Sequence, residues 1–396
     1  MRSSRTSADA EIVLKAGRDA AIRRRRHPWV YSQAVGEVRG DPASGIVRVI
    51  GADGAVLGWG FHSSASLIAV RMISFGPGAP AEGWLRERMK AASALRRTFR
   101  LDSDAYRLVN AEGDFIPGLI VDVYADTAVV SVHVKGMESL LDSVESALAE
   151  TLPDAKMYLK RDEHYSRREG LSLSSGYLRG DGDGTALITE NGIRYLVDFA
   201  RGQKTGFYLD QRRNRTVAAE LASGRSVLNL FSYSGGFALA AARAGARHVV
   251  SVDSSAHALE LGARNTSLNP EIDAGALEWV RNDAMEFLKN APRSGLAIVD
   301  PPPFARRRSE KEGAVKGYLG LNQRVLTLAE PGGYVLSFSC SGAVSREDFR
   351  QLLSEAALRA GRRARFLREL GADVDHPVST DHPEGEYLKG WLIHAE

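Results

Sequence analysis

Short apolar runs, separated by glycine and proline, occupy most of the first 75 residues. The runs are EIVLKAG, WVYSQAVGEV, GIVRVIG, AVLGWGFH and SLIAVRMI, and they are rich in the β-branched and aromatic residues that strands favour. Only the stretch at residues 19–26 has room for a helix. The pattern predicts a flexible tail over residues 1–10 and a small β-barrel-like domain over residues 11–75.

A different pattern follows the linker-like stretch GPGAPAEG. Residues 84–100 have the spacing of an amphipathic basic helix, and LVNAEGDFIPGLIVDVYADTAVVSVHV predicts a turn followed by strands. A helix is expected over residues 137–151, and more strands are expected near residues 155–175. Together these elements indicate a small mixed α+β domain over residues 84–180.

Strand and helix patterns alternate from about residue 186 to the end. SVLNLF, HVVSVD, LEWVRND, LAIVDPPP and YVLSFSC are apolar strand patterns, and a helix pattern follows each of them. Such alternation is typical of βαβ units around a parallel sheet. We therefore expect an α/β domain over residues 186–396.

Composition narrows the class of protein. Hydrophobic residues make up 44% and charged residues 26%, as in an ordinary globular protein with substantial cores. No apolar run reaches membrane-spanning length, and the first residues lack the apolar stretch of a secretory signal. These features predict a cytoplasmic protein without a membrane partner.

The formal net charge is only +3, but arginines gather in RDAAIRRRRHPW and in ARRRSEK. A single basic run is most often a solvated face. Two arginine runs that lie beside other sequence motifs also fit a nucleic-acid partner.

Three predicted strand ends have the chemistry of a nucleoside-binding site. Gly235 and Gly236 in NLFSYSGGFALAAA open a helix directly after a strand, where the backbone can approach a ligand closely. Asp253 ends the next strand, 18 residues after Gly235, close to the spacing at which an acidic residue meets ribose. Asp283 ends the third strand. Because FSYSGGF does not match G-x-G-x-x-G, the pattern disfavours dinucleotides and favours S-adenosylmethionine.

The two remaining strand ends are candidates for the reacting groups. VDPPPF places Asp300 before a stiff proline turn, and SFSCSG places Cys340, the only cysteine, at the end of the following strand. A lone cysteine is usually a buried filler. At a strand end among small polar residues, however, Cys340 is also a candidate nucleophile.

These motifs, in this order, resemble the RlmI-like family of bacterial ribosomal RNA cytosine-5 methyltransferases. RHPWVYSQAVGEV is similar to that family's RNA-binding PUA module, and EGDFIPGLIVDVY is similar to its central domain. GQKTGFYLDQRRNR, NLFSYSGGFALAAARAGA, VDPPPFARRR, FSCSG and DHPVSTDHPEGEYLKG follow in the family's order. The resemblance spans nearly the whole chain. It implies a PUA β-barrel, a small central α+β domain and a class I Rossmann-like methyltransferase domain.

The resemblance implies a set of contacts to S-adenosylmethionine. These residues would line its methionine part (Phe231, Ser232, Gly235, Gly236), hold its ribose (Asp253), meet its adenine (Asn282, Asp283) and close the site (Phe207, Asp210, Gln211). Asp300 is also expected among the cofactor contacts.

The resemblance also implies the catalytic roles. Cys340 would add to carbon 6 of the target cytosine, and Asp300 would steady the base. The addition breaks the conjugation of the ring and makes carbon 5 reactive toward a methyl donor. The chain has no second cysteine to remove the carbon 5 proton, so that base stays unassigned. Pro303 stands where the family's DPPKF motif has lysine.

The implied partner is ribosomal RNA, of the large subunit. The expected contacts are basic or aromatic side chains, namely Arg24, Arg25, Arg26, Trp29, Lys204, Arg212, Phe304, Arg306 and Arg307. Of these, Lys204 and Arg212 are expected to face either the cofactor or the RNA. For Trp29, stacking on a base and packing in a core are equally good interpretations. The sequence leaves the oligomeric state open, a homodimer included.

Three rival functions remain open from the sequence. Uracil-5 methylation needs the same thiol addition, an amino-group methyltransferase needs no cysteine, and an RNA-binding assembly factor needs no turnover. HPVSTDHPEGEYLKG contains two histidines and two glutamates but matches no standard zinc spacing, so we expect no metal there and a closing β-hairpin instead.

Overall fold

The computed structural model describes residues 10–42, 45–305 and 308–396. Contacts divide the chain into two compact units, and each is described by itself. The first contains the described residues up to Ala186 together with Asp198–Gly206 and Val374–Gly385, and the second contains the remainder. Residues 1–9 of the tail predicted over residues 1–10 lie outside the described residues, and Ala10 is buried. The predicted domain boundaries remain predictions.

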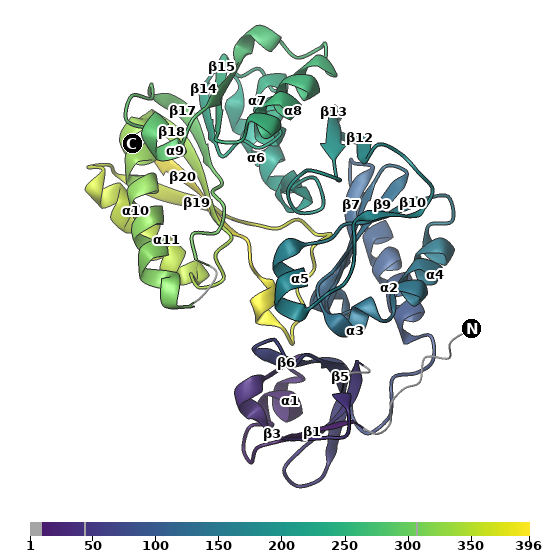
Figure 1. Ribbon diagram of the computed structural model, residues 1–396. Coiled ribbons are helices and arrows are strands. Elements are labelled where there is room, and N and C mark those ends of the chain that lie inside the picture. The colour runs from purple at the N-terminus through teal and green to yellow at the C-terminus, as the bar shows by residue number, and fades with distance from the viewer. Residues whose placement is uncertain (1–9, 43–44, 306–307) are drawn as a thin grey trace. The chain divides into compact units, whose positions relative to one another are not determined.

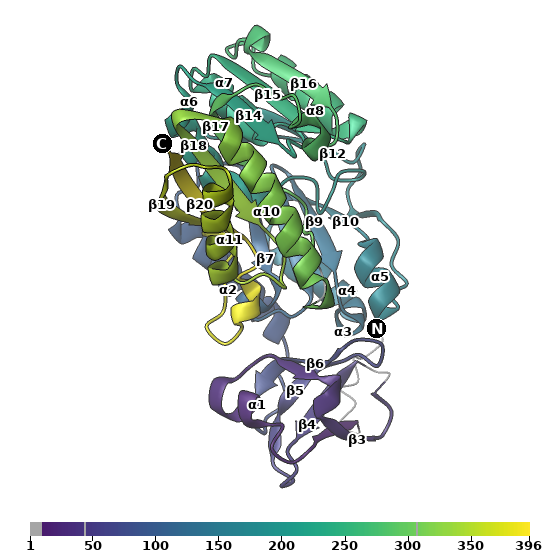
Figure 2. The same cartoon turned by 90° about the vertical axis from the view of Figure 1, so that its left-hand side faces the viewer.

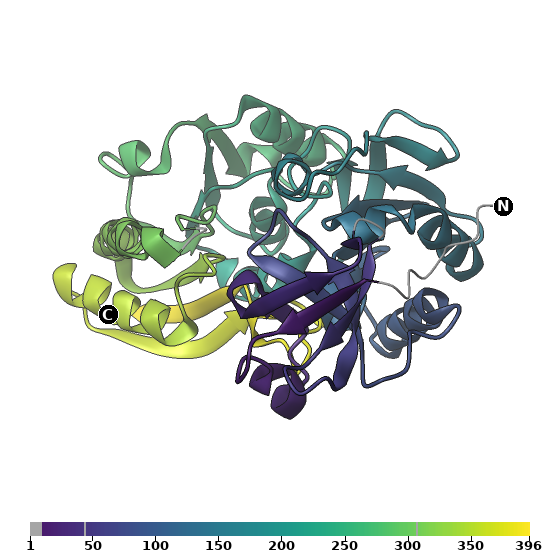
Figure 3. The same ribbon diagram turned by 60° about the horizontal axis from the view of Figure 1, so that its bottom comes forward.

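A curled six-stranded sheet forms the N-terminal part of the first unit (Figures 1 and 3). Its strand order is β2-β6-β5-β4-β1-β3, and Ile12 and Leu14 of β1 point into a core with Val47 and Val49 of β4. The predicted short helix is α1 (Ala20–Arg25), of which only Ile22 is buried. The strands are β1 (Glu11–Leu14), β2 (Trp29–Tyr31), β3 (Val35–Arg39), β4 (Ile46–Ile50), β5 (Val56–His62) and β6 (Ile68–Phe75).

The central part of the first unit is a five-stranded sheet with helices. Its strand order is β11-β10-β9-β8-β7, and β8 and β9 supply buried valines to its core. The strands are β7 (Ala105–Asn110), β8 (Leu119–Tyr124), β9 (Thr127–Val132), β10 (Lys156–Leu159) and β11 (Gly176–Arg179). The helices are α2 (Trp84–Thr98), α3 (Lys135–Glu138), α4 (Leu141–Thr151) and α5 (Glu163–Glu169).

Two details of this part correct the sequence prediction. The helix expected over residues 137–151 is divided into α3 and α4, and α5 lies where strands were expected near residues 155–175. Asp162 begins α5 by accepting hydrogen bonds from the backbone N–H groups of His164 and Tyr165, and Gly170 ends it in the left-handed conformation. Both are ordinary helix boundary signals, so α5 could have been found from the sequence.

The second unit is built on a seven-stranded sheet (Figure 2). Its order is β16-β15-β14-β17-β18-β20-β19, in which β14 to β18 are parallel and β20 is antiparallel to both its neighbours. The α/β architecture predicted from the alternating pattern is confirmed. The strands are β14 (Ser226–Leu230), β15 (His248–Asp253), β16 (Leu277–Arg281), β17 (Ser294–Val299), β18 (Ala329–Ser339), β19 (Ala364–Gly371) and β20 (Lys389–Ala395).

Helices cover both faces of this sheet. Along β14 and β17, Leu228, Leu230 and Val299 pack with α10 and α11, whereas Val227 and Ile298 pack with α6 and α7. The strands are therefore buried on both sides, as parallel strands usually are. The helices are α6 (Arg212–Ala222), α7 (Gly236–Arg243), α8 (Ala256–Ser267), α9 (Ala284–Phe287), α10 (Lys311–Leu328) and α11 (Arg346–Arg359), and α10 lies beside α11 in Figure 2. A short hairpin, β12 (Thr185–Glu190) and β13 (Ile193–Asp198), precedes them.

None of the helices in the described part of the chain has both the length and the apolar character to cross a membrane.

The closing hairpin differs from the prediction. It is formed by β19 and β20, while the intervening segment Val374–Gly385 groups with the first unit. There, Asp375 accepts hydrogen bonds from the Arg96 guanidinium and the Arg107 backbone, and Asn110 donates to Pro377. Most of the segment read as a hairpin is therefore an anchored loop.

Burial makes the central part sensitive to acid. The His133 imidazole stacks on Tyr165 with ring centroids 3.9 Å apart, and burial lowers its pKa to about 4. An unfolded histidine titrates near 6.5, so the unfolded state binds the extra proton first as the pH falls. Stability from this group is present above about pH 6.5 and is lost as the pH falls toward 4.

We expect His133→Phe, which keeps the stacked ring without a titratable group, to reduce the acid sensitivity. Urea unfolding at pH 7 and pH 5 should show the wild type losing roughly 2 kcal/mol more than the variant. Equal losses in the two proteins would contradict the assignment.

Candidate active site

The carboxyl ends of the five parallel strands bring most predicted site residues to one edge of the sheet. Phe231 follows β14, Asp253 ends β15, Asp283 follows β16, Asp300 follows β17 and Cys340 follows β18. The chain order reverses between β14 and β17, which are neighbours. Ligands of open α/β sheets bind at this kind of reversal, so the edge is the natural site.

The loop between β14 and α7 is strained. Phe231 and Tyr233 have positive φ values of 59° and 46°, and Gly235 has a φ of 84°. Non-glycine residues adopt this region at a cost, and such strain concentrates at functional sites. The buried hydroxyls of Ser232 and Ser234 find no hydrogen-bond partner among the described residues. The loop therefore offers polar atoms to a ligand.

Trp279 explains why two glycines are needed beside this loop. A Cβ atom on Gly235 would lie 2.4 Å from the indole, and one on Gly262 of α8 would lie 2.6 Å from it. Trp279 on β16 thus packs against both glycines. The sequence analysis missed Trp279 and Gly262, because only the folded chain brings them to Gly235.

Asp253 and Asp283 both bind the backbone. The carboxylate of Asp253 accepts hydrogen bonds from the N–H groups of Tyr233 and Ser255, each at 2.9 Å. Asp283 is exposed and caps α9 through the N–H groups of Met285 and Glu286. Neighbouring Asn282 is half-buried, and its N–H donates to the backbone oxygen of Asp253. These acidic residues shape the loops in addition to any contact with a ligand.

The residues expected to close the site are buried. Phe207, Asp210 and Gln211 are each less than 5% exposed. Arg215 holds this segment: its guanidinium lies over the Phe207 ring, 4.7 Å from the centroid, and donates to the Tyr208 carbonyl at 2.9 Å.

Two further contacts secure the same segment. Tyr387 donates a hydrogen bond to Asp210, and Asn214 donates to Gln211. The side chain of Arg215 also lies beside Gly236, 3.0 Å from where a Cβ would stand. Arg215 and Tyr387 are structural residues of the site that the motif reading did not single out.

Arg212 is buried between two carboxylates. It is 3% exposed, and its guanidinium pairs with Asp373 at 2.8 Å and Glu190 at 3.4 Å. The ion pairs with Asp373 and Glu190 give the guanidinium of Arg212 a structural role, and its contact with RNA or cofactor stays a prediction.

Hydrogen bonds join the proline loop to the cysteine loop. The Cys340 sulfur lies 3.7 Å from the Pro301 carbonyl, and the Ala305 N–H donates to the Ser341 hydroxyl at 3.2 Å. Tyr318 of α10 shares a hydrogen bond of 2.9 Å with the same hydroxyl. Cys340 and Asp300 are both half-buried rather than sealed in the core. The nucleophile candidate thus stands beside the turn that carries Asp300.

Tyr208 and Lys389 belong to this neighbourhood but were not predicted. Burial raises the pKa of Tyr208, and the negative charges of Asp300 and Cys340 raise it further. Lys389 is 4% exposed and donates to the carbonyls of Ser341 and Tyr387. A lysine in EYLKG could have been suspected only with the strand pairing known.

The predicted RNA contacts have different surroundings. Arg24, Arg25 and Arg26 are exposed, as is Lys204. Trp29 is half-buried: its indole donates to Glu112 at 2.8 Å and meets the His382 ring edge-on at 4.3 Å. Phe304 packs on Tyr318, with centroids 4.5 Å apart. Arg306 and Arg307 lie outside the described residues.

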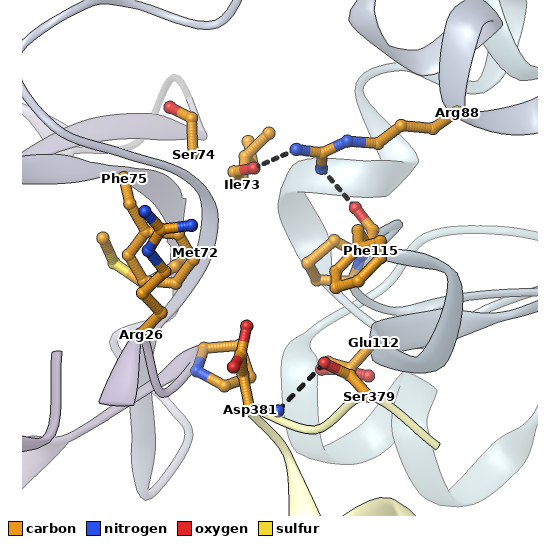
Figure 4. A pocket seen from close by; sticks show the side chains of 12 residues that line it. Arg26, Met72, Ile73, Ser74, Phe75, Arg88, Glu112, Phe115, Ser379 and Asp381 are labelled. Carbon is orange, nitrogen blue, oxygen red and sulfur yellow. Dashed lines mark hydrogen bonds between the residues drawn. The ribbon is translucent and has the colours of Figure 1, made fainter. Parts of the chain in front are cut away.

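The first unit also contains an open cavity of about 360 Å³ (Figure 4). Arg26, Phe75 and Phe115 line it, together with Glu112 and Asp381. The cavity was not predicted from the sequence, because its walls come from several stretches that are far apart in the chain.

Comparisons with known proteins add to this geometry. A family model described as S-adenosylmethionine-dependent methyltransferase matches residues 148–383, and one described as a PUA-like domain matches residues 12–75. Ribosomal RNA large subunit methyltransferase I of Aeromonas hydrophila is 37% identical over 98% of this chain and 99% of that protein. The protein of the same name from Shewanella amazonensis is 38% identical over 96% and 98%.

Two solved structures share the fold. A proposed SAM-dependent methyltransferase from Streptococcus mutans has a TM-score of 0.84 at 23% identity, covering 97% of this chain and 99% of its own. A methyltransferase structure complexed with SAH has a TM-score of 0.85 at 24% identity and the same coverage.

We expect Gly235→Ala to destabilise the second unit by roughly 2–4 kcal/mol, because the methyl group meets Trp279 and the residue must keep a positive φ. Gly320→Ala is the matched control. Gly320 lies inside α10 with nothing within 4 Å of a new Cβ, so alanine should stabilise by about 0.5–1 kcal/mol. Denaturant unfolding of both variants is the measurement, and a neutral Gly235→Ala would show that the loop relaxes.

Proposed function

This chain belongs to the ribosomal RNA large subunit methyltransferase I family, and from that premise we propose that it methylates carbon 5 of a cytosine in large-subunit ribosomal RNA. The expected family, the combination of a PUA-like domain with a class I methyltransferase domain, and S-adenosylmethionine as cofactor are confirmed. The observation that supports the finer proposal is the junction of the Cys340 and Asp300 loops, on the sheet edge that also carries the β14–α7 loop.

The residues of the sheet edge fit S-adenosylmethionine. The unpartnered hydroxyls of Ser232 and Ser234 and the strained backbone around Phe231 suit a polar ligand at this turn. In the proposal the methionine part lies along Phe231, Ser232, Gly235 and Gly236, the ribose at Asp253, and the adenine at Asn282 and Asp283. Phe207, Asp210 and Gln211 close the site from the buried segment before α6.

Cys340 is the proposed nucleophile. Its thiolate adds to carbon 6 of the cytosine, which moves the electron pair of the ring double bond toward carbon 5. S-adenosylmethionine, when bound, supplies an electrophilic methyl group for that carbon. A base then takes the proton from carbon 5, and the bond between sulfur and carbon 6 breaks to return the thiolate. Cys340 thus ends the cycle unchanged.

Asp300 is proposed to steady the base during this cycle. It stands one residue before Pro301, whose carbonyl is the contact of the Cys340 sulfur. A group at that place can hold the polar edge of the cytosine, where charge develops as the thiolate adds. The base that removes the carbon 5 proton remains open between Asp300, a water molecule and a basic residue.

RNA binding is assigned to the PUA-like domain and to exposed cations. Arg24, Arg25 and Arg26 on the N-terminal part and Lys204 can meet phosphates, which would make binding weaken as salt rises. A cytosine inside a helix cannot reach a sheet-edge site, so the target must be unstacked or single-stranded.

We expect Cys340→Ala to abolish methyl transfer while leaving the fold and cofactor binding intact, because only the nucleophile is removed. The measurement uses tritiated S-adenosylmethionine and unmodified large-subunit RNA, followed by digestion to nucleosides. The wild type should yield labelled 5-methylcytidine. RNA containing 5-fluorocytidine should trap the wild type, but not the variant, as a covalent complex, because fluorine at carbon 5 blocks the proton removal.

The rival functions give different results in the same experiment. Labelled 5-methyluridine in place of 5-methylcytidine would show that the target base is uracil. Full activity of Cys340→Ala would favour an amino-group methyltransferase, and absence of transfer to any RNA would favour an assembly factor.

A further inference from the structure

The cavity in the first unit has no part in the proposed chemistry. Its volume, about 360 Å³, falls in the range of small-molecule pockets, roughly 300–1,000 Å³. Figure 4 shows Phe75 and Arg26 on one side and Phe115 on the other, with Asp381 at the floor. Two aromatic rings on opposite walls are the arrangement that receives a flat ring.

Phe115 combines an exposed ring with a strained backbone conformation. It is 55% exposed and has a positive φ of 59°, which a bulky residue rarely adopts. Arg88 donates hydrogen bonds to the carbonyls of Phe115 and Ile73, so one guanidinium ties the two walls together. The ring of Phe115 is not buried in a core, and its backbone is strained, so packing and local conformation do not explain a phenylalanine at this position. Contact of the ring with a ligand would explain it.

Glu112 and Asp381 line the cavity itself, but the arginines of the RRRR run include cations that are available to a polyanion. Arg23 is neutralised by Asp19 and Asp53. In the described part of the chain, Arg24, Arg25 and Arg26 make no ion pair. Arg26 lines the aromatic pocket, and the exposed Arg24 and Arg25 precede it in the chain. An aromatic pocket with a cation in its wall matches a nucleotide, whose base stacks while its phosphates meet cations.

We propose that this cavity receives one unstacked nucleobase of the substrate RNA, stacked between Phe75 and Phe115, with neighbouring phosphates on Arg24 to Arg26. The inference deepens the proposed function and rests on RNA being the substrate. The carboxylate of Asp381 gives the pocket an acceptor for an exocyclic amino group, as carboxylates accept from cytosine N4.

The test uses the full chain and a single-stranded RNA 12-mer with 2-aminopurine at its centre, whose fluorescence falls when the base stacks. The wild type should quench it. Phe115→Gly removes the ring and relieves the backbone, so folding is not at risk, and it should weaken binding roughly 10-fold and abolish the quench. Phe99→Ala, which removes a 38% exposed phenylalanine outside the cavity, should change neither.

Arg26→Gln should lower affinity and reduce the salt dependence by about one phosphate contact. Unchanged affinity and quenching in Phe115→Gly, or absence of quenching in the wild type, would overturn the proposal and leave the cavity to a protein partner. Methyl transfer is scored separately: quenching without methylation defeats the proposed function alone, and methylation without quenching defeats the cavity assignment alone.

A second, independent observation concerns Lys389. Its Cα pairs with that of Ser339, and its ammonium donates to the Ser341 carbonyl at 3.1 Å and the Tyr387 carbonyl at 2.9 Å. The two serines are the neighbours of Cys340 in the chain. Lys389 is thus bound to both neighbours of the proposed nucleophile, through its strand pairing to Ser339 and through its ammonium to Ser341.

This ammonium has no acidic partner within the described residues. Glu386 is neutralised by Arg346 at 2.6 Å, and both carbonyls that hold Lys389 are uncharged. A buried lysine is rare without a counter-ion. Burial lowers the pKa of Lys389, and negative charge on Cys340 raises it.

The geometry points to Lys389 as a positioning residue whose ammonium is the counter-ion of the Cys340 thiolate. This inference rests on the role given to Cys340 in the proposed function. The other titratable groups around the thiol are Asp300, Tyr208, Tyr318, Arg346 and Glu386, of which Asp300 opposes a thiolate and Arg346 is occupied by carboxylates.

Because Cys340 is the only cysteine, alkylation by iodoacetamide reports on it alone. We expect Lys389→Met to move the pH midpoint of alkylation upward by about one unit or more, so that the rate at pH 7 falls about tenfold. Lys389→Arg should restore part of the shift. Lys311→Met, which breaks an ion pair with Asp348 at the start of α10, should leave it unchanged.

Folding is checked by thermal unfolding, and methionine in place of a buried ammonium is commonly tolerated. Methyl transfer by Lys389→Met should show a lower kcat with an unchanged KM for RNA. An unchanged alkylation midpoint would overturn the inference whether or not the protein methylates RNA, while a shifted midpoint in an inactive wild type would defeat only the proposed function.

Discussion

Ser341 is the junction on which the candidate chemical site depends. It is completely buried, and its hydroxyl binds the Ala305 N–H of the proline loop and the Tyr318 hydroxyl of α10. Its carbonyl accepts the ammonium of Lys389. One small residue therefore joins the turn after β17, a helix and the start of β20, and the neighbouring Cys340 takes its position from these bonds.

The cofactor end of the edge is organised by a different constraint. Successive residues of the β14–α7 loop alternate into the positive φ region, and Asp253 holds that shape by accepting the Tyr233 N–H. Trp279 then leaves room for nothing larger than glycine at position 235. A loop determined so tightly keeps its polar atoms in place before a ligand arrives, which lowers the cost of ordering on binding.

The buried cations of the second unit are compensated in two different ways. Arg215 is buried but bound by both oxygens of Glu190, and Arg212 shares that glutamate and Asp373. Both guanidinium groups are thus paired with carboxylates, and Arg215 also holds the segment that contains Phe207 and Tyr208. Among the described residues Lys389 has no such carboxylate, and its ammonium is held by the carbonyls of Ser341 and Tyr387. Buried charge is thus compensated by carboxylates around Arg212 and Arg215, and by backbone carbonyls beside Cys340 around Lys389.

Much of the fold follows from local pattern alone. The alternation of apolar strands and helices after residue 186 determined the parallel sheet, and because parallel strands share one carboxyl edge it also placed Asp253, Asp283, Asp300 and Cys340 together. Asp162 and Gly170 are ordinary helix boundary signals, so local sequence also determines where α5 begins and ends.

Tertiary structure decided what no local pattern contains. The sequence around Arg212 suggests an exposed cation, but the fold pairs its guanidinium with Asp373, far along the chain. Lys389 lies opposite Ser339 only because β18 and β20 pair. The cavity between Phe75 and Phe115 likewise exists only when separate stretches of chain form its walls. Local sequence determines the conformation of a segment, whereas the partner of a charge or a ring is determined by which distant segments the fold brings within contact distance.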